Sequence, residues 1–261
     1  MAELARTLRH RLLELTAVER WRVAVAARAA EAPREGQAFV RWFDELREAG
    51  PGQHDPLFPW LAEEASLDDL RWFLTQEVAG EAGFDDLVAL SQLGMPARAK
   101  LEMARNYWDE MGQGHAEGMH GPMLSRLADA LELPRGGDVV VESLELSNLM
   151  LALAHHRHYA FHSVGALGAI ELTAPGRSAL VNAALKRLGV AGEARRYFAL
   201  HATLDVKHSE AWNREVLAPL VDRDPRVAQA LAEGALMRLQ AGARCFERYR
   251  RELGVRAREA A

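Results

Sequence analysis

The chain has 261 residues, of which 49% are hydrophobic and 26% are charged, with ten histidines, one cysteine and a formal net charge of −5. This composition supports a folded core and excludes intrinsic disorder as the main state. Because 37 acidic residues outnumber 32 basic ones, the chain has no overall positive field for nucleic acid, and we expect no nucleic-acid partner. The single Cys245 excludes an internal disulfide and a thiolate metal cage, so a metal site would depend on histidines and carboxylates.

The N-terminal residues lack the apolar core of a signal peptide, and no long apolar stretch is suited to crossing a membrane. We therefore expect a cytoplasmic protein without a membrane partner.

Apolar residues recur at three- and four-residue steps along almost the whole chain, which is the period of the α-helix. Gly and Pro divide this pattern, Ser66 and Asp69 form a capping-box signal, and residues 54–60 are expected to form a loop. The pattern predicts an all-α fold in one domain, 1–261, because no linker or change of composition interrupts it. The expected helices span residues 1–31, 35–49, 67–81, 84–93, 96–111, 116–132, 143–173, 177–188, 192–217 and 225–253.

The segment from His201 to His208 concentrates groups that can bind a metal. At 100° per residue, His201, Asp205 and His208 fall within about 60° of one another on one helix face. Two imidazoles and a carboxylate in phase indicate a metal-binding stripe, with a solvated helix face as the alternative.

A second pair, Glu117 and His120, has the Glu-x-x-His spacing that places both side chains on one helix face in carboxylate di-iron bundles. Two further acids, Glu77 and Glu171, stand on apolar helical faces, where a carboxylate requires a cation, a hydrogen-bond donor or a metal. Salt bridges to arginine are the alternative explanation for both acids.

The order and spacing of these residues resemble the ligand pattern of the heme-oxygenase-like di-iron oxidases and oxygenases, whose sequences are often labelled iron-containing redox enzymes. The residues around the pattern match as well, with Asp109–Gly114 before the Glu-x-x-His pair and Gly165, Gly168 and Pro175 around the third acid. The resemblance covers roughly residues 54–217.

The resemblance implies a heme-oxygenase-like up-and-down helical bundle of about seven core helices with extra short ones. It also implies two iron ions, or one manganese and one iron, with O2 as co-substrate. One iron would be held by Glu117, His120 and His208. The other would be held or bridged by Glu77, Glu171, Asp205 and His201. Four carboxylates and three imidazoles suit iron or manganese better than a soft metal.

Glu110 precedes Glu117 by two helical turns, so it could add a carboxylate to the metal site or support a ligand. The Gly112–Gly114 break weakens that argument, and a surface acid is the alternative. Gly165 and Gly168 lie on the Glu171 side of their predicted helix, where they would allow either space for a substrate or a tight helix crossing.

The resemblance implies a non-heme di-iron oxidase or oxygenase that acts on a small organic substrate. The reaction would be N-oxygenation of an amine or oxidative C–C cleavage and decarboxylation of an amino or fatty acid. Repeated turnover would need an external electron donor, and the resemblance is compatible with a homodimer. The alternative is a metal-independent helical enzyme similar to thiaminase or quinone-biosynthesis relatives, or a small-molecule binding protein, in which the same acids and histidines contact the ligand.

Overall fold

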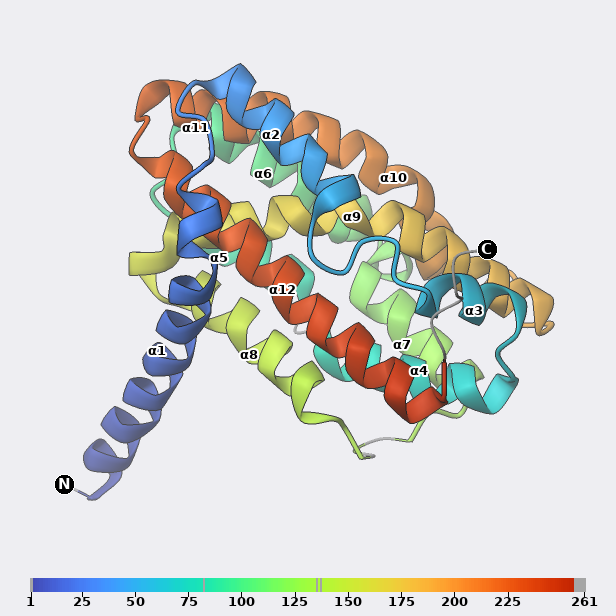
Figure 1. Ribbon diagram of the computed structural model, residues 1–261. Helices are drawn as coiled ribbons and strands as arrows, with labels where there is room; N and C mark the ends of the chain where they lie inside the picture. The colour runs from blue at the N-terminus through green and yellow to red at the C-terminus, as the bar shows by residue number, and fades with distance from the viewer. Residues whose placement is uncertain (1, 82, 135, 137, 256–261) are drawn as a thin grey trace, which may run out of the picture.

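The computed structural model describes residues 2–81, 83–134, 136 and 138–255, and most of them lie in helices (Figure 1). The helices are α1 (Ala2–Ala29), α2 (Gly36–Ala49), α3 (Leu57–Glu63), α4 (Leu67–Gly80), α5 (Phe84–Ser91), α6 (Ala97–Glu110), α7 (His120–Ala130), α8 (Val141–His155), α9 (Ala160–Arg187), α10 (Arg196–Trp212), α11 (Ala218–Arg223) and α12 (Val227–Leu253). Within the described residues, the strand-like pairing is limited to one isolated bridge between Met111 and Met119. The prediction of an all-α bundle is confirmed.

Helix α9 lies at the centre of the bundle, between α12 and α10. Its crossing with α12 is close because glycines meet there. A Cβ on Gly165 would lie 1.9 Å from the Leu231 carbonyl oxygen, and one on Gly234 would lie 1.9 Å from the His162 carbonyl oxygen. A tight helix crossing, rather than room for a substrate, therefore explains Gly165. The space beside Gly168 is also occupied, because a Cβ there would lie 2.8 Å from the Trp212 indole.

Several predicted boundaries differ from the structure. The expected loop at 54–60 contains the start of α3, and the helix expected at 143–173 is interrupted after His155 by a 3-10 turn, Arg157–Tyr159. Conversely, α9 continues through Pro175, where the sequence predicted an end. Packing of α9 on both of its long neighbours offsets the backbone hydrogen bond that proline cannot donate.

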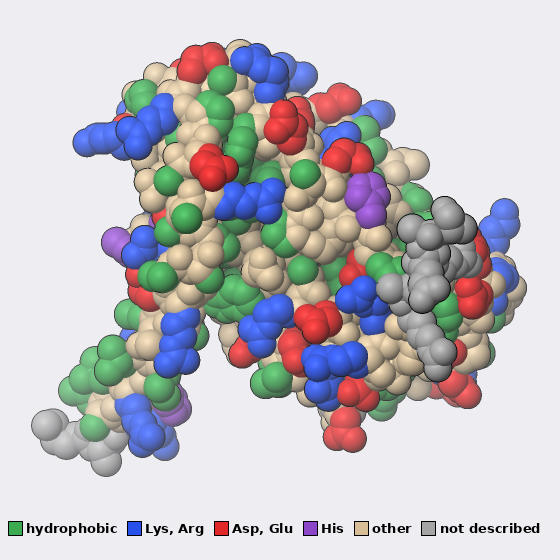
Figure 2. All heavy atoms as spheres, in the orientation of Figure 1, with side chains coloured by type: hydrophobic (Ala, Val, Ile, Leu, Met, Phe, Trp, Pro, Cys, Tyr) green, Lys and Arg blue, Asp and Glu red, His purple; other side chains and the backbone are tan. Residues whose placement is uncertain are grey.

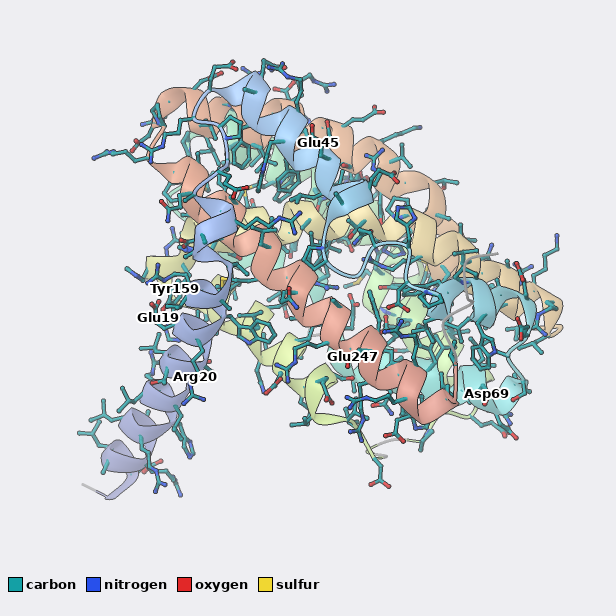
Figure 3. The ribbon with its side chains drawn as sticks, in the orientation of Figure 1. Glu19, Arg20, Glu45, Asp69, Tyr159 and Glu247 are labelled. Atoms are coloured by element: carbon teal, nitrogen blue, oxygen red, sulfur yellow. The ribbon has the colours of Figure 1, made fainter. Side chains whose placement is uncertain are left out.

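Helix α1 projects from the body of the bundle at its N-terminal end (Figure 1). Its C-terminal half is anchored, since the Tyr159 hydroxyl donates to Glu19 Oε1 at 2.6 Å (Figure 3). The Ser66 and Asp69 capping box forms as predicted, with Asp69 on the surface. Figure 2 shows acidic and basic side chains interspersed over the visible face. None of the helices in the described part of the chain is long and apolar enough to cross a membrane.

Candidate metal centre

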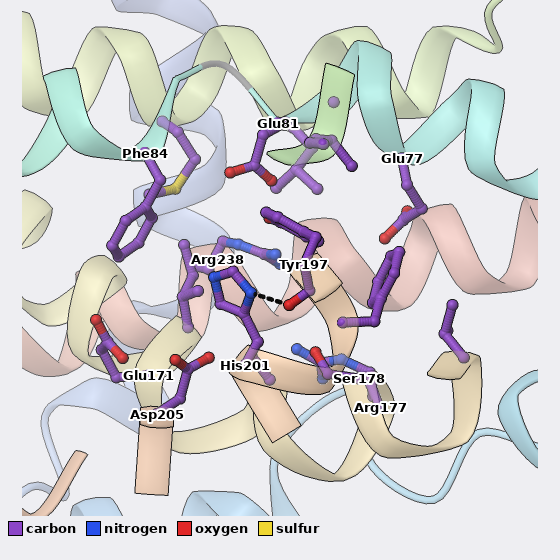
Figure 4. Close-up of a pocket in the computed structure, with 18 of the residues that line it drawn as sticks. Glu77, Glu81, Phe84, Glu171, Arg177, Ser178, Tyr197, His201, Asp205 and Arg238 are labelled. Atoms are coloured by element: carbon purple, nitrogen blue, oxygen red, sulfur yellow. Dashed lines mark hydrogen bonds between the residues drawn. The ribbon is translucent and has the colours of Figure 1, made fainter. Parts of the chain in front are cut away.

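A cavity of about 140 Å³ lies between α4, α6, α9, α10 and α12, and acidic and imidazole side chains line one part of it (Figure 4). The stripe predicted on α10 faces this region. Asp205 and His208 are buried, and His201 lines the cavity.

The loop between α6 and α7 brings Glu110 and His120 together. Glu110 ends α6 and His120 begins α7, and the bridge between Met111 and Met119 closes the loop between them. Glycine is required in this loop, because Gly112 has φ +60° and a Cβ there would lie 2.3 Å from the backbone of Gly118. The closed loop therefore places a carboxylate and an imidazole side by side, although ten positions separate them in the sequence.

Glu110, His120 and His201 form the first potential metal-binding group, and their ligand atoms all lie within 4.8 Å of one another. His120 Nδ1 is 2.5 Å from Glu110 Oε2, and the imidazole centroids of His120 and His201 are 4.5 Å apart. Glu110 and His120 are both buried.

Glu110, Glu171 and His208 form the second potential group, again within 4.8 Å. His208 Nδ1 lies 3.5 Å from Glu171 Oε2 and 3.9 Å from Asp205 Oδ1. Because Glu110 belongs to both groups, the side chains form one continuous cluster in which a single carboxylate lies between two candidate metal positions.

Neighbouring groups orient the candidate ligands. His201 Nδ1 donates to the Tyr197 carbonyl oxygen at 2.7 Å, and this bond leaves Nε2 with a free lone pair. His208 Nε2 bonds Asp109 Oδ2 at 3.1 Å, so its Nδ1 is turned toward Glu171. Asn106 Nδ2 donates to Glu171 Oε1 at 2.6 Å. Supporting hydrogen bonds of this kind fix the tautomer and orientation of metal ligands in proteins.

Burial and mutual repulsion shift the ionisation of the cluster. Burial and the Glu171 carboxylate hold the pKa of Glu110 well above its ordinary value, and burial, Glu171 and Glu110 raise the pKa of Asp205 to about 10. Burial and His120 lower the pKa of His201 to about 4. Although burial opposes its charge, the carboxylates of Glu171 and Asp109 raise the pKa of His208 to about 9.

The cluster fits a divalent cation. Both ring nitrogens of His120 and Nδ1 of His208 are buried without a hydrogen-bond partner among the described residues. The close approach of His120 to Glu110 lacks hydrogen-bond geometry, which is expected of two ligands converging on a third atom. A cation would accept a lone pair from one ring nitrogen of each histidine and relieve the repulsion between carboxylates. Imidazole and carboxylate donors suit iron or manganese.

The structure brings together five of the seven predicted ligands: His120, Glu171, His201, Asp205 and His208. Their grouping differs from the prediction, because His120 pairs with His201 whereas His208 pairs with Glu171. The expected helix at 116–132 begins only at His120, so Glu117 lies in a 3-10 turn with its side chain exposed and does not share a face with His120. Glu110 occupies the cluster instead.

Glu77 lines the same cavity but belongs to neither metal-binding group. Burial raises its pKa, whereas Arg238, a hydrogen bond from Tyr249, and Arg177 act in the opposite direction. Glu77 therefore has arginine neighbours, as the alternative explanation for this acid expected.

The predictions omitted Glu81, Asn106 and Asp109. Glu81 stands one helical turn after Glu77, and this spacing was the available signal. Burial and the carboxylates of Glu110 and Glu77 raise the pKa of Glu81 to about 8. Asn106 and Asp109 lie on α6 one turn or less before Glu110, but nothing in the sequence indicates which ligands they orient.

Comparison with known proteins gives a family and a fold. A family model described as an iron-containing redox enzyme matches residues 71–243. Two crystal structures of a CADD-like protein of unknown function from Nostoc punctiforme are similar to the chain at 18% identity. They cover 81% and 84% of this chain and 95% and 96% of their own, with TM-scores of 0.64 and 0.61. At this identity the likeness shows the fold alone. No curated protein matches the chain significantly.

Proposed function

Because the chain belongs to the iron-containing redox enzyme family, we propose that it is a non-heme di-iron oxidase or oxygenase that uses O2 to oxidise a small organic substrate. The reaction would be amine N-oxygenation or oxidative C–C cleavage with decarboxylation. The observation that carries the proposal is the position of Glu110, which joins two groups of metal-competent side chains into one buried cluster.

The first iron would be held by Glu110, His120 and His201, and the second by Glu110, Glu171 and His208, with Asp205 beside them. Ferrous iron at this centre would supply electrons for the reduction of O2, and an external donor would restore them for each turnover.

The protein's own groups prepare this centre. Asp109 and the Tyr197 carbonyl hold protons on the outer nitrogens of His208 and His201, so the inner nitrogens face the cluster. Asn106 orients Glu171 by donating to Oε1. Glu81, with its pKa raised by burial to about 8, can hold a proton at the cavity wall near neutral pH and release it during a reaction.

Apolar side chains complete the cavity and limit access of water to the cluster. They include Phe58, Phe73, Phe84, Leu124 and Met150. Thiol chemistry of the thiaminase type has no support here, because Cys245 is fully buried and burial raises its pKa to about 12.

The test is anaerobic loading with Fe(II) followed by rapid mixing with O2. We expect the wild-type protein to bind iron and to consume O2 as the bound iron is oxidised, whereas His120→Ala and His208→Ala lose both properties. His155→Ala is the matched control, because that imidazole is exposed. Retention of iron and of O2 consumption in both His120→Ala and His208→Ala would contradict the proposal, as would a wild-type protein that binds no iron.

A further inference from the structure

The cavity beside the metal centre contains two arginines that the proposed chemistry does not use. Arg177 comes from α9 and Arg238 from α12, and Figure 4 shows both among the side chains that line the cavity. Arg177 lies six residues after Glu171 on α9, about 9 Å along the helix axis at 1.5 Å per residue. The cavity therefore has an acidic and imidazole part at the cluster and a cationic part beyond it.

The two guanidinium groups have little compensation from carboxylates. Arg177 donates to Thr173 Oγ1 at 2.9 Å and otherwise lies over aromatic rings, 5.9 Å from the Phe58 centroid and 5.4 Å from the Phe246 centroid. Burial and the neighbouring guanidinium of Arg238 lower the pKa of Arg177 to about 9. The contacts of Arg177 thus stabilise its planar body but supply no anion.

Arg238 is also incompletely satisfied, because its Nε is buried without a hydrogen-bond partner among the described residues. The groups that face it are Cys245, Glu77, Glu81 and Tyr249. Burial raises the pKa of Cys245 to about 12 and the pKa of Glu81 to about 8, so neither supplies a full negative charge at neutral pH. Glu77 is the remaining counter-ion for two cations.

A purely structural role would not require both arginines. One guanidinium would neutralise Glu77, whereas a second one nearby adds repulsion and a desolvation cost. An unpaired guanidinium edge that lines a cavity is suited to a planar anion, since its N–H groups match the two oxygens of a carboxylate.

We propose that Arg177 and Arg238 bind the carboxylate of the substrate, so that the substrate is a small carboxylic acid or amino acid held by its acid end away from the metal centre. That the bound acid is the substrate rests on the proposed function. Binding of a carboxylate at the two arginines does not, because it requires no metal.

The volume of the cavity suits a small molecule. It is about 140 Å³, roughly ten times the ~10–15 Å³ that a single buried water needs, so a small organic acid fits. With its carboxylate at the arginines, the opposite end of the molecule faces Glu110 and Glu171. This orientation favours oxidation of a distal amine or carbon over loss of the carboxylate itself.

The test uses three monocarboxylates, butyrate, hexanoate and phenylacetate, each compared with its uncharged amide by isothermal titration calorimetry at pH 7. Metal-free protein is used first, so that a carboxylate cannot bind through iron. We expect at least one acid to bind tenfold or more tightly than its amide. Arg177→Gln and Arg238→Gln should each weaken that acid at least tenfold, with partial recovery in the Lys variants. Arg226→Gln, which removes a charge from the surface, should have no effect.

Thermal unfolding checks that each variant is folded, and the Lys variants keep the test informative if a Gln variant is not. Equal binding of acids and amides, or no binding of any acid, would overturn the inference. It would also fail if His208→Gln abolished acid binding while the arginine variants did not, because the anion would then lie at the cluster.

Iron loading of the same proteins separates this inference from the proposed function. A wild-type protein that binds no iron but selects acids over amides through Arg177 and Arg238 would refute the oxygenase proposal and retain the anion site. Normal iron binding with no preference for acids over amides would retain the oxygenase proposal and refute the anion site.

Discussion

Replacement of Glu110 by Gln tests the shared carboxylate most sharply, and Glu117→Gln is its matched control. Glu110 belongs to both metal-binding groups, and its Oε2 lies 2.5 Å from His120 Nδ1. Glu117 is exposed and belongs to neither group. The two substitutions make the same exchange of a carboxyl group for an amide at positions only seven residues apart, so a difference between them reports the location of the carboxyl group.

The expected magnitude follows from the two roles of Glu110. Loss of a group that merely orients a ligand lowers metal affinity about 10- to 100-fold. Loss of a ligand shared by both positions should exceed that range, so we expect each Fe(II) affinity to fall by more than ~100-fold, or about 2.7 kcal/mol per ion. Stability of the metal-free protein should change little, because burial holds the pKa of Glu110 well above its ordinary value and the protonated acid resembles Gln in shape.

Anaerobic isothermal titration calorimetry with Fe(II) measures both affinities, and metal analysis after desalting measures how much iron each variant retains. The control variant should bind iron as the wild type does and should unfold within about 0.5 kcal/mol of it. The reasoning would be refuted if Glu110→Gln retained both ions at wild-type affinity, or if Glu117→Gln lost them, because the predicted Glu-x-x-His pair would then be the functional one.

Three further outcomes are expected. Asp109→Asn should lower iron affinity about 10- to 100-fold without unfolding the protein, and unchanged affinity in calorimetry would contradict its orienting role. Gly165→Ala should destabilise by about 3 kcal/mol in urea unfolding, because its Cβ meets a carbonyl oxygen at 1.9 Å, whereas Gly176→Ala in the same helix has open space and should stabilise by about 0.5–1 kcal/mol. Burial lowers the pKa of His162 despite its bond to Glu233. The unfolded chain therefore binds more protons, and the free energy of unfolding should decrease as pH falls below about 6.5. His162→Gln should lessen this decrease between pH 7 and 5, and an unchanged slope would exclude His162 as a contributor.

The fold could be predicted from the sequence because helical periodicity is a local property and most breaks carry glycine or proline. The stripe from His201 to His208 followed from the same periodicity, since α10 is uninterrupted across it. Pro175 was misread because tertiary packing on α9 overrides a local helix-breaking signal.

The choice between Glu110 and Glu117 could not be made from periodicity. Between Met111 and Met119 the chain leaves the helical path, with Gln113 at φ +53° and glycines on either side at positive φ. A loop of this kind changes the angular phase of everything that follows it, so counting residues from Glu117 to His120 no longer indicates a shared face. The contact between Glu110 and His120 depends on how the loop closes, which is a tertiary property.

Glu77 and Glu81 show a related limit. They stand four residues apart, Glu77 on α4 and Glu81 directly after its last residue, but the helical pattern predicted only Glu77 as a ligand. Residues from distant helices distinguish the two acids, because Tyr249 on α12 and Arg177 on α9 act on Glu77, whereas Glu110 on α6 acts on Glu81.

Anomalous diffraction at the iron edge, from crystals grown anaerobically with Fe(II), tests the central claim most directly. We expect two iron peaks per chain, one bounded by Glu110, His120 and His201 and the other by Glu110, Glu171 and His208. A single peak, no peak, or a peak beside Glu117 would contradict it.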